Sequence, residues 1–280
     1  MKITTEDYLY NNQKCIKFSN DTIDLIIPKN FGPRIIYAGF KNERNFFDEI
    51  EDIEFKTKYG TWKLYGGHRL WIAPENIETY YPDNEPVDLQ YKNQIVIISK
   101  SFDEIGLRKE ILVRFIGKNK VEVFHKICNI STKSKILSLW TLSVMTKNGT
   151  AILPQNIEPI DGNKFLPNRN LVLWQYTDIS DNRLKITNDF VNVKQDPKAK
   201  TPLKIGQYLN SGWIAYKFSK YFFVKKFFNK GYYSEYPDYG VNVEVYSCDK
   251  FLELELLTPL VKLKPKKVLV QKEIWEFYKK

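Results

Sequence analysis

The alternation of hydrophobic and polar residues along this chain is typical of β-strands. Three central runs alternate with a period of two, namely Gln94–Ser101, Gly106–Ile116 and Lys120–Asn129. Short polar segments at Phe102–Glu104 and Gly117–Asn119 separate these runs. Because such short connections join antiparallel strands, we expect a meander over this region.

The same pattern continues toward the C-terminus. Further predicted strands are Ile136–Met145, Gly212–Lys217, Tyr221–Phe228, Val241–Ser247, Phe251–Leu257 and Val268–Tyr278. Asp48–Phe55 is the best candidate for a short helix. Many short strands with frequent turns and no linker predict an all-β fold. We expect a large two-sheet antiparallel β-sandwich, built as a single domain over residues 1–280.

The charge of the chain does not by itself indicate a nucleic-acid partner. The formal net charge is +10, and 36 of the 43 basic residues are lysines. These lysines are spread along the sequence, whereas nucleic-acid sites favour clustered cations and arginine forks. Nucleic acid is therefore an unlikely partner on this pattern, and a steep salt dependence of binding would be its signature.

The chain has the features of a cytoplasmic protein that does not associate with membranes. The N-terminal residues contain no apolar signal core, and the longest aliphatic runs are too short to cross a bilayer. Cys15, Cys128 and Cys248 are odd in number and widely spaced. This spacing predicts reduced thiols, with neither a disulfide framework nor a zinc cluster.

One stretch, Tyr65–Glu75, concentrates chemically useful side chains. It contains a glycine pair followed by His68, Arg69, Trp71 and Glu75. Glycines let a backbone approach a ligand closely or take positive φ, so the stretch suits a polar small molecule. A glycine turn followed by an ordinary half-buried strand explains the same residues, and spacing alone does not separate the two interpretations.

A second candidate site is the strand Phe251–Leu257, which places Glu253 and Glu255 on one face. Such carboxylates are usually solvated, but in a ligand cleft one could act as a general base. His125 shares its strand face with apolar residues, so we expect a packed, hydrogen-bonded histidine. His68 and His125 are far apart in sequence, and no metal or cofactor motif accompanies them.

At this point the sequence resembles the galactose mutarotase-like (aldose 1-epimerase) superfamily, and most closely a bacterial branch of it. The most specific part of the resemblance is Trp62–Trp71, which is similar to the substrate loop of the family. The other matching stretches are Asn30–Ile36, Asn45–Phe47, Phe124–Asn129, Leu139–Met145, Pro154–Gln155, Tyr236–Gly240, Glu255–Pro259 and Glu273–Trp275.

The resemblance implies a β-supersandwich with an open, concave sugar site. In mutarotases a histidine protonates the ring oxygen, and a late glutamate takes the proton of the anomeric hydroxyl. Glu255 resembles that base, with Glu253 as the alternative register, and Arg34 and His68 resemble substrate-binding residues. The segment corresponding to the usual acid histidine, Leu139–Leu142, contains no histidine, which leaves His68 as the acid.

Two hypotheses follow for the function. The first is a carbohydrate-binding protein that acts as an aldose 1-epimerase-like isomerase, with Glu255 as base and His68 as acid. The second is a glycan-binding or sugar-sensing module without catalysis. In both, the residues expected to contact the sugar are Arg34, Arg69, Trp71, Glu75 and Trp140. No cofactor is expected.

Overall fold

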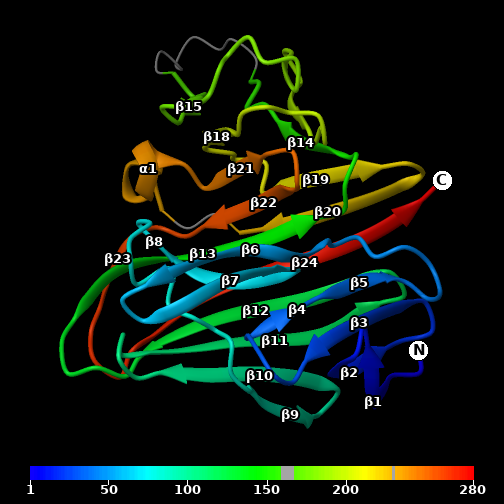
Figure 1. The fold of residues 1–280 in the computed structure, drawn as a ribbon. Helices are drawn as coiled ribbons and strands as arrows, with labels where there is room; N and C mark the ends of the chain where they lie inside the picture. Colours follow the sequence, from blue (N-terminus) through cyan, green and yellow to red (C-terminus); the bar gives the residue numbers. More distant parts are fainter. Residues whose placement is uncertain (159–166, 229–230) are drawn as a thin grey trace.

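The protein is built from two large antiparallel sheets and two smaller ones (Figure 1). The structure is a computed structural model that describes residues 1–158, 167–228 and 231–280. The ten-stranded sheet has the order β16 (Leu184–Ile186), β17 (Phe190–Lys194), β14 (Thr150–Pro154), β19 (Trp213–Phe218), β20 (Tyr221–Phe227), β24 (Val268–Lys279), β12 (Lys120–Asn129), β11 (Leu107–Gly117), β10 (Ile95–Phe102) and β9 (Asp88–Lys92).

The second large sheet carries most of the residues discussed below. Its order is β15 (Val172–Leu173), β18 (Leu203–Gln207), β21 (Val243–Ser247), β22 (Leu252–Leu257), β13 (Lys135–Met145), β8 (His68–Ala73) and β4 (Arg34–Ile35), and β23 (Val261–Leu263) also pairs with β13. The smaller sheets are β1 (Thr4–Tyr10), β2 (Gln13–Ser19), β3 (Ile23–Pro28) and β5 (Tyr37–Phe40), and the hairpin β6 (Glu49–Thr57) and β7 (Gly60–Gly66).

The all-β prediction is confirmed. Within the described residues, helix is confined to η1 (Tyr233–Glu235) and α1 (Pro237–Gly240), and no helix there is long and apolar enough to cross a bilayer. The predicted meander corresponds to β10, β11 and β12, and the predicted last strand corresponds to β24. In Figure 1 both chain termini lie on the same side of the molecule.

The main core lies between the two large sheets. Strand alternation sends Leu70 and Ile72 of β8 into this core, where they join Val121 and Val123 of β12. The intervening residue Trp71 belongs to a separate apolar cluster on the other face of its sheet. The second large sheet therefore has an inner face against the core and an outer face that carries its own aromatic cluster.

The prediction of a helix at Asp48–Phe55 is wrong, because this segment forms strand β6. Its register against β7 shifts between Ile50 and Glu54, as at a β-bulge. The irregularity allows Ile50 and Ile53, three residues apart, to pack in the same apolar cluster. Apolar residues three positions apart are also typical of one face of a helix. The spacing at this bulge therefore resembles a helical pattern.

Candidate functional site

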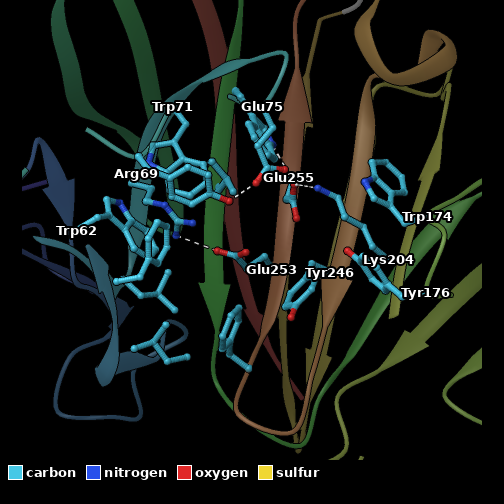
Figure 2. Close-up of a pocket in the computed structure, with 17 residues that line it drawn as sticks. Trp62, Arg69, Trp71, Glu75, Trp174, Tyr176, Lys204, Tyr246, Glu253 and Glu255 are labelled. Carbon is cyan, nitrogen blue, oxygen red and sulfur yellow. Dashed lines mark hydrogen bonds and ion pairs between the residues drawn. The ribbon is translucent and has the colours of Figure 1, made fainter. Parts of the chain in front are cut away.

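A cleft of about 350 Å³ opens on the outer face of the second large sheet (Figure 2). One wall comes from the β6–β7 hairpin, and the floor comes from β8, β13, β22 and β18. The lining residues are Ile53, Phe55, Trp62, Leu64, Arg69, Trp71, Glu75, Tyr80, Trp140, Leu142, Trp174, Tyr176, Lys204, Tyr246, Phe251, Glu253 and Glu255. The cleft thus combines an aromatic lining with a small number of charged groups, a composition common in small-molecule sites.

Strand register explains why residues from distant parts of the chain meet here. Trp140 of β13 lies directly opposite Trp71 of β8, and the two rings are 5.4 Å apart in a T-shaped contact. On the other side of β13, Leu142 is paired with Glu255. Since side chains alternate along each strand, these residues and Arg69 share the outer face. The cleft is therefore a direct product of antiparallel pairing.

Arg69 is held in the cleft by two contacts. Its Nη1 lies 2.8 Å from Oε1 of Glu253, and its guanidinium lies over the Trp71 ring, 4.2 Å from the centroid. Arg69 is only 2% exposed and Glu253 only 7%. A cation that is both paired with a carboxylate and stacked on an indole is fixed in position. The pair forms one polar wall of the cleft (Figure 2).

Lys204 and Glu255 form the opposite polar wall, and Glu244 pairs with Lys204 from behind the lining. Nζ of Lys204 lies 2.7 Å from Oε2 of Glu244 and 3.2 Å from Oε2 of Glu255. The same Nζ lies 4.7 Å from the ring centroids of both Trp140 and Trp174. Indole Nε1 of Trp140 also donates to Oε2 of Glu255 at 2.9 Å. One ammonium therefore organises two carboxylates and two indoles.

Burial shifts the proton affinities of this group. Glu244 and Glu255 lie opposite each other on β21 and β22, and both are almost completely buried. Desolvation raises the pKa of both carboxyls, while Lys204 opposes that effect. Burial alone would lower the pKa of Lys204, but the two carboxylates raise it above its ordinary value. Lys204 therefore remains a cation, and Glu255 holds a proton more readily than a solvated glutamate does.

Glu75 lies at the exposed end of the cleft. Its carboxylate accepts a hydrogen bond from the hydroxyl of Tyr80, whose ring packs against those of Trp62 and Trp71. Tyr80 and Tyr176 thus add phenolic hydroxyls to the aromatic lining. Of the residues predicted from the sequence, Arg69, Trp71, Glu75, Trp140 and Glu255 line this one cleft, and so does the alternative Glu253.

His68 does not line the cleft, which corrects the sequence-based placement of this residue. Its side chain points to the inner face of β8 and is completely buried. Nδ1 of His68 lies 2.8 Å from Oγ of Ser143, and Nε2 lies 2.7 Å from Nε2 of His125. Burial lowers the pKa of both histidines, that of His125 to about 4. Both imidazoles are therefore neutral and packed in the core. The sequence predicted this environment for His125 but not for His68.

The two histidines belong to a polar group inside the core that also includes Glu273 and Lys225. Lys225 Nζ lies 3.4 Å from Oε2 of Glu273, and both residues are completely buried. Within the described part of the chain, His68, His125 and Glu273 are a set of donors close enough to surround a metal ion. The 2.7 Å between the imidazole nitrogens is a hydrogen-bond distance, shorter than two ligands of one zinc ion at about 2.0–2.1 Å each would allow.

Arg34 also lies outside the cleft lining, so its predicted contact with a sugar is not supported. Its Nη1 donates to the carbonyls of Leu64 and Gly66, at 2.9 and 2.6 Å, and its Nη2 pairs with Asp83 at 2.7 Å. Arg34 is completely buried and fastens the β7 backbone to the loop that contains Asp83. Position 66, whose carbonyl accepts one of these bonds, requires a glycine. A Cβ on Gly66 would lie 2.1 Å from the Asp48 carbonyl oxygen.

Sequence reasoning missed Lys204, Trp174 and Tyr176 as site residues. Lys204 lies between the core residues Leu203 and Ile205, an alternating pattern that could have marked β18 as a strand with a cation on the face opposite the core. Trp174 and Tyr176 carry no comparable signal, since they follow the two-residue strand β15. Only the sheet order, which places β15 beside β18, brings them to the cleft.

No protein-family model matches this sequence, and no curated protein sequence does either. Solved structures are similar over almost the whole chain. A galactose mutarotase-like protein from Lactobacillus casei aligns with a TM-score of 0.57 at 9% identity, over 94% of this chain and 100% of that chain. A galactose mutarotase related enzyme from Lactobacillus acidophilus aligns with a TM-score of 0.51 at 11% identity, over 98% and 97%.

The chain has the galactose mutarotase-like fold. A third example, the Slr1438 protein from Synechocystis sp., aligns with a TM-score of 0.57 at 8% identity, over 98% of this chain and 99% of that chain. At such low identity the likeness concerns the fold alone. The residues that line the cleft, and not the fold, therefore determine what the cleft binds.

Proposed function

We propose that the protein binds a sugar in the cleft on the outer face of the second large sheet. The observation that carries the proposal is the combination of indole rings with fixed carboxylates in one hollow. The apolar C–H face of a pyranose packs on rings such as Trp71, Trp140 and Trp174, and its hydroxyls donate to carboxylates such as Glu253 and Glu255. The fold of the similar structures, named for mutarotases, supports the same class of ligand.

The charges of the cleft favour a sugar without a phosphate group. Arg69 is paired with Glu253, and Lys204 is paired with Glu244 and Glu255. Glu75 adds a further carboxylate at the exposed end. A phosphate would have to displace one of these carboxylates from its cation and leave it unpaired in a mostly buried place. A neutral sugar needs no such rearrangement.

Interconversion of anomers is the second candidate, and the surroundings of Glu255 favour it. A general base works best when its pKa lies near the working pH, and burial shifts the pKa of Glu255 in that direction. In this mechanism Glu255 removes the proton of the anomeric hydroxyl. The proton for the ring oxygen comes from another cleft group or from water, because His68 lies in the core.

Calorimetric titration with a panel of free hexoses, pentoses and amino sugars tests binding. We expect saturable binding that is weakened about tenfold by Trp140→Ala, since loss of stacking and burial on an indole should cost about 1.4 kcal/mol. Trp213→Ala is the matched control, because Trp213 lies on β19 and does not line the cleft. Equal losses in the two variants, or no binding by any sugar, would contradict the proposal.

Polarimetry of freshly dissolved sugars tests the catalytic candidate separately. If Glu255 is the base, Glu255→Gln abolishes the acceleration of mutarotation and retains sugar binding. Glu110→Gln, a glutamate of β11 outside the cleft, serves as the matched control. A wild-type protein that binds the sugar without accelerating mutarotation would leave the non-catalytic, sugar-sensing function.

A further inference from the structure

A second hollow adjoins the cleft. It has a volume of about 390 Å³ and shares Ile53, Tyr246 and Phe251 with the cleft. Its other lining residues come from the segment before β18 and from the β21–β22 turn, namely Ala199, Lys200, Thr201, Pro202, Cys248, Asp249 and Lys250. Both hollows fall within the size range of small-molecule sites, roughly 300–1,000 Å³.

The boundary between the two hollows consists of side chains. Tyr246 and Phe251 lie on β21 and just before β22, with ring centroids 5.5 Å apart and planes tilted by 38°. Both residues line both hollows, so an occupant of either one would contact the same two rings. Figure 2 shows Tyr246 beside Glu253 and below Glu255.

The second hollow has the groups that a sugar residue needs. Pro202, Ile53 and Phe251 provide apolar surface for a pyranose face. Thr201, Asp249 and Lys200 provide a hydroxyl, a carboxylate and an ammonium for its hydroxyls. Thr201, Asp249 and Lys200 are exposed, so they can exchange water for a ligand at little cost.

We infer that the cleft and the second hollow together bind two linked sugar residues. One residue lies on Trp71 and Trp140 beside Glu255, and the next lies beyond Phe251, against Thr201 and Asp249. The ligand class is then a disaccharide or longer glycan. This inference rests on the proposed sugar-binding function, and it concerns the length of the ligand.

Titrations with glucose, maltose, cellobiose and lactose, and with galactose and 1,4-galactobiose, test the inference. We expect at least one disaccharide to bind about tenfold more tightly than its reducing monosaccharide, as one added stacked ring would provide. Thr201→Trp should fill the second hollow from an exposed position and remove this gain, with monosaccharide affinity changed less than about twofold. The double variant with Lys200→Ala and Asp249→Ala should reduce the affinity gain of the disaccharide without adding a bulky side chain.

Lys118→Trp is the matched control, because it adds an indole at an exposed turn between β11 and β12, outside both hollows. Monosaccharide binding that depends on Trp140, with no gain for any disaccharide and no effect of Thr201→Trp, would overturn the inference and leave the sugar site intact. The absence of binding by every sugar, or indifference to Trp140→Ala, would instead refute the proposed function on which the inference rests.

Discussion

The side chains of His68 and Arg69 lie on opposite faces of β8, although the two residues are adjacent in the chain. His68 meets His125 in the core between the sheets, whereas Arg69 meets Glu253 in the cleft. A strand cannot present neighbouring side chains to one site, so only one of the two can contact a ligand. His68 therefore packs in the core, and Arg69 is the residue of the two that lines the cleft.

Acid should destabilise the protein through His68 and His125. Both pKa values in the folded state lie below the ordinary 6.5, so the unfolded chain binds these protons first. The contribution of the two neutral histidines to the free energy of unfolding is fully present above about pH 6.5 and is lost as the pH falls. For His125, whose pKa is about 4, the loss reaches about 3 kcal/mol near pH 4.

Urea unfolding at pH 7.5, 6.5, 5.5 and 4.5 measures this loss. In His125→Gln the slope of unfolding free energy against pH should be smaller below pH 6.5 than in the wild-type protein. Lys126→Gln, on the same strand with its side chain on the other face, is a control that should keep the wild-type slope. Parallel profiles for wild type and His125→Gln would show that His125 does not contribute to the acid sensitivity.

Lys204→Met should destabilise the protein more at pH 8 than at pH 5. The substitution leaves Glu244 and Glu255 facing each other without their shared cation. Removing one partner of a buried ion pair costs about 3–5 kcal/mol when the remaining charge stays ionised. At pH 5 the two carboxyls, whose pKa values are already raised, can take up protons and relieve the repulsion. Thermal unfolding at both pH values is the measurement. A loss of stability that is the same at pH 5 and pH 8 would show that Lys204 does not neutralise Glu244 and Glu255.

Gly66→Ala should destabilise the protein by about 2–4 kcal/mol, because it combines a positive φ with a backbone clash. The φ of Gly66 is 77°, and a Cβ there would lie 2.1 Å from the Asp48 carbonyl oxygen. Gly117→Ala is the matched control, since its nearest neighbour would be the flexible Lys120 side chain at 3.5 Å. Chemical denaturation compares the two, and equal effects would refute the packing role assigned to Gly66.

Hexose 6-phosphates should bind at least about tenfold more weakly than the corresponding free hexoses, because an added anion meets carboxylates whose cations are already paired. Competition calorimetry at low and moderate salt measures the ratio. Glu75→Gln should reduce the discrimination, because it removes the carboxylate at the exposed end of the cleft. A sugar phosphate that binds more tightly than its parent sugar would contradict the charge argument.

The sequence predicted the all-β fold, and of the 17 residues that line the cleft it singled out six, namely Arg69, Trp71, Glu75, Trp140, Glu253 and Glu255. Period-two alternation identified the strands of the meander, and Glu253 and Glu255 were correctly placed on one face. The same alternation separates His68 from Arg69, but the resemblance to a sugar-binding loop had placed both in the site. Local pattern also failed at β6, where a register shift produced helix-like spacing.

The remaining site residues depend on long-range pairing. Lys204 reaches Glu255 because β18 pairs with β21, which in turn pairs with β22. The neighbouring carboxylate Glu244 was visible as a polar position between two valines, but its partner was not. Sheet order is a property of the complete fold, so no single stretch of sequence could reveal this cluster.

The most direct test of the sugar cleft is the set of indole N–H signals in a two-dimensional ¹H–¹⁵N spectrum of the labelled protein. The chain has six tryptophans, of which Trp62, Trp71, Trp140 and Trp174 line the cleft, while Trp213 and Trp275 do not. We predict that a binding sugar shifts signals of the cleft indoles, that of Trp140 above all, since its Nε1 donates to Glu255. The signals of Trp213 and Trp275 should stay in place. Shifts confined to these two indoles, or unchanged cleft signals at saturating sugar, would contradict the account.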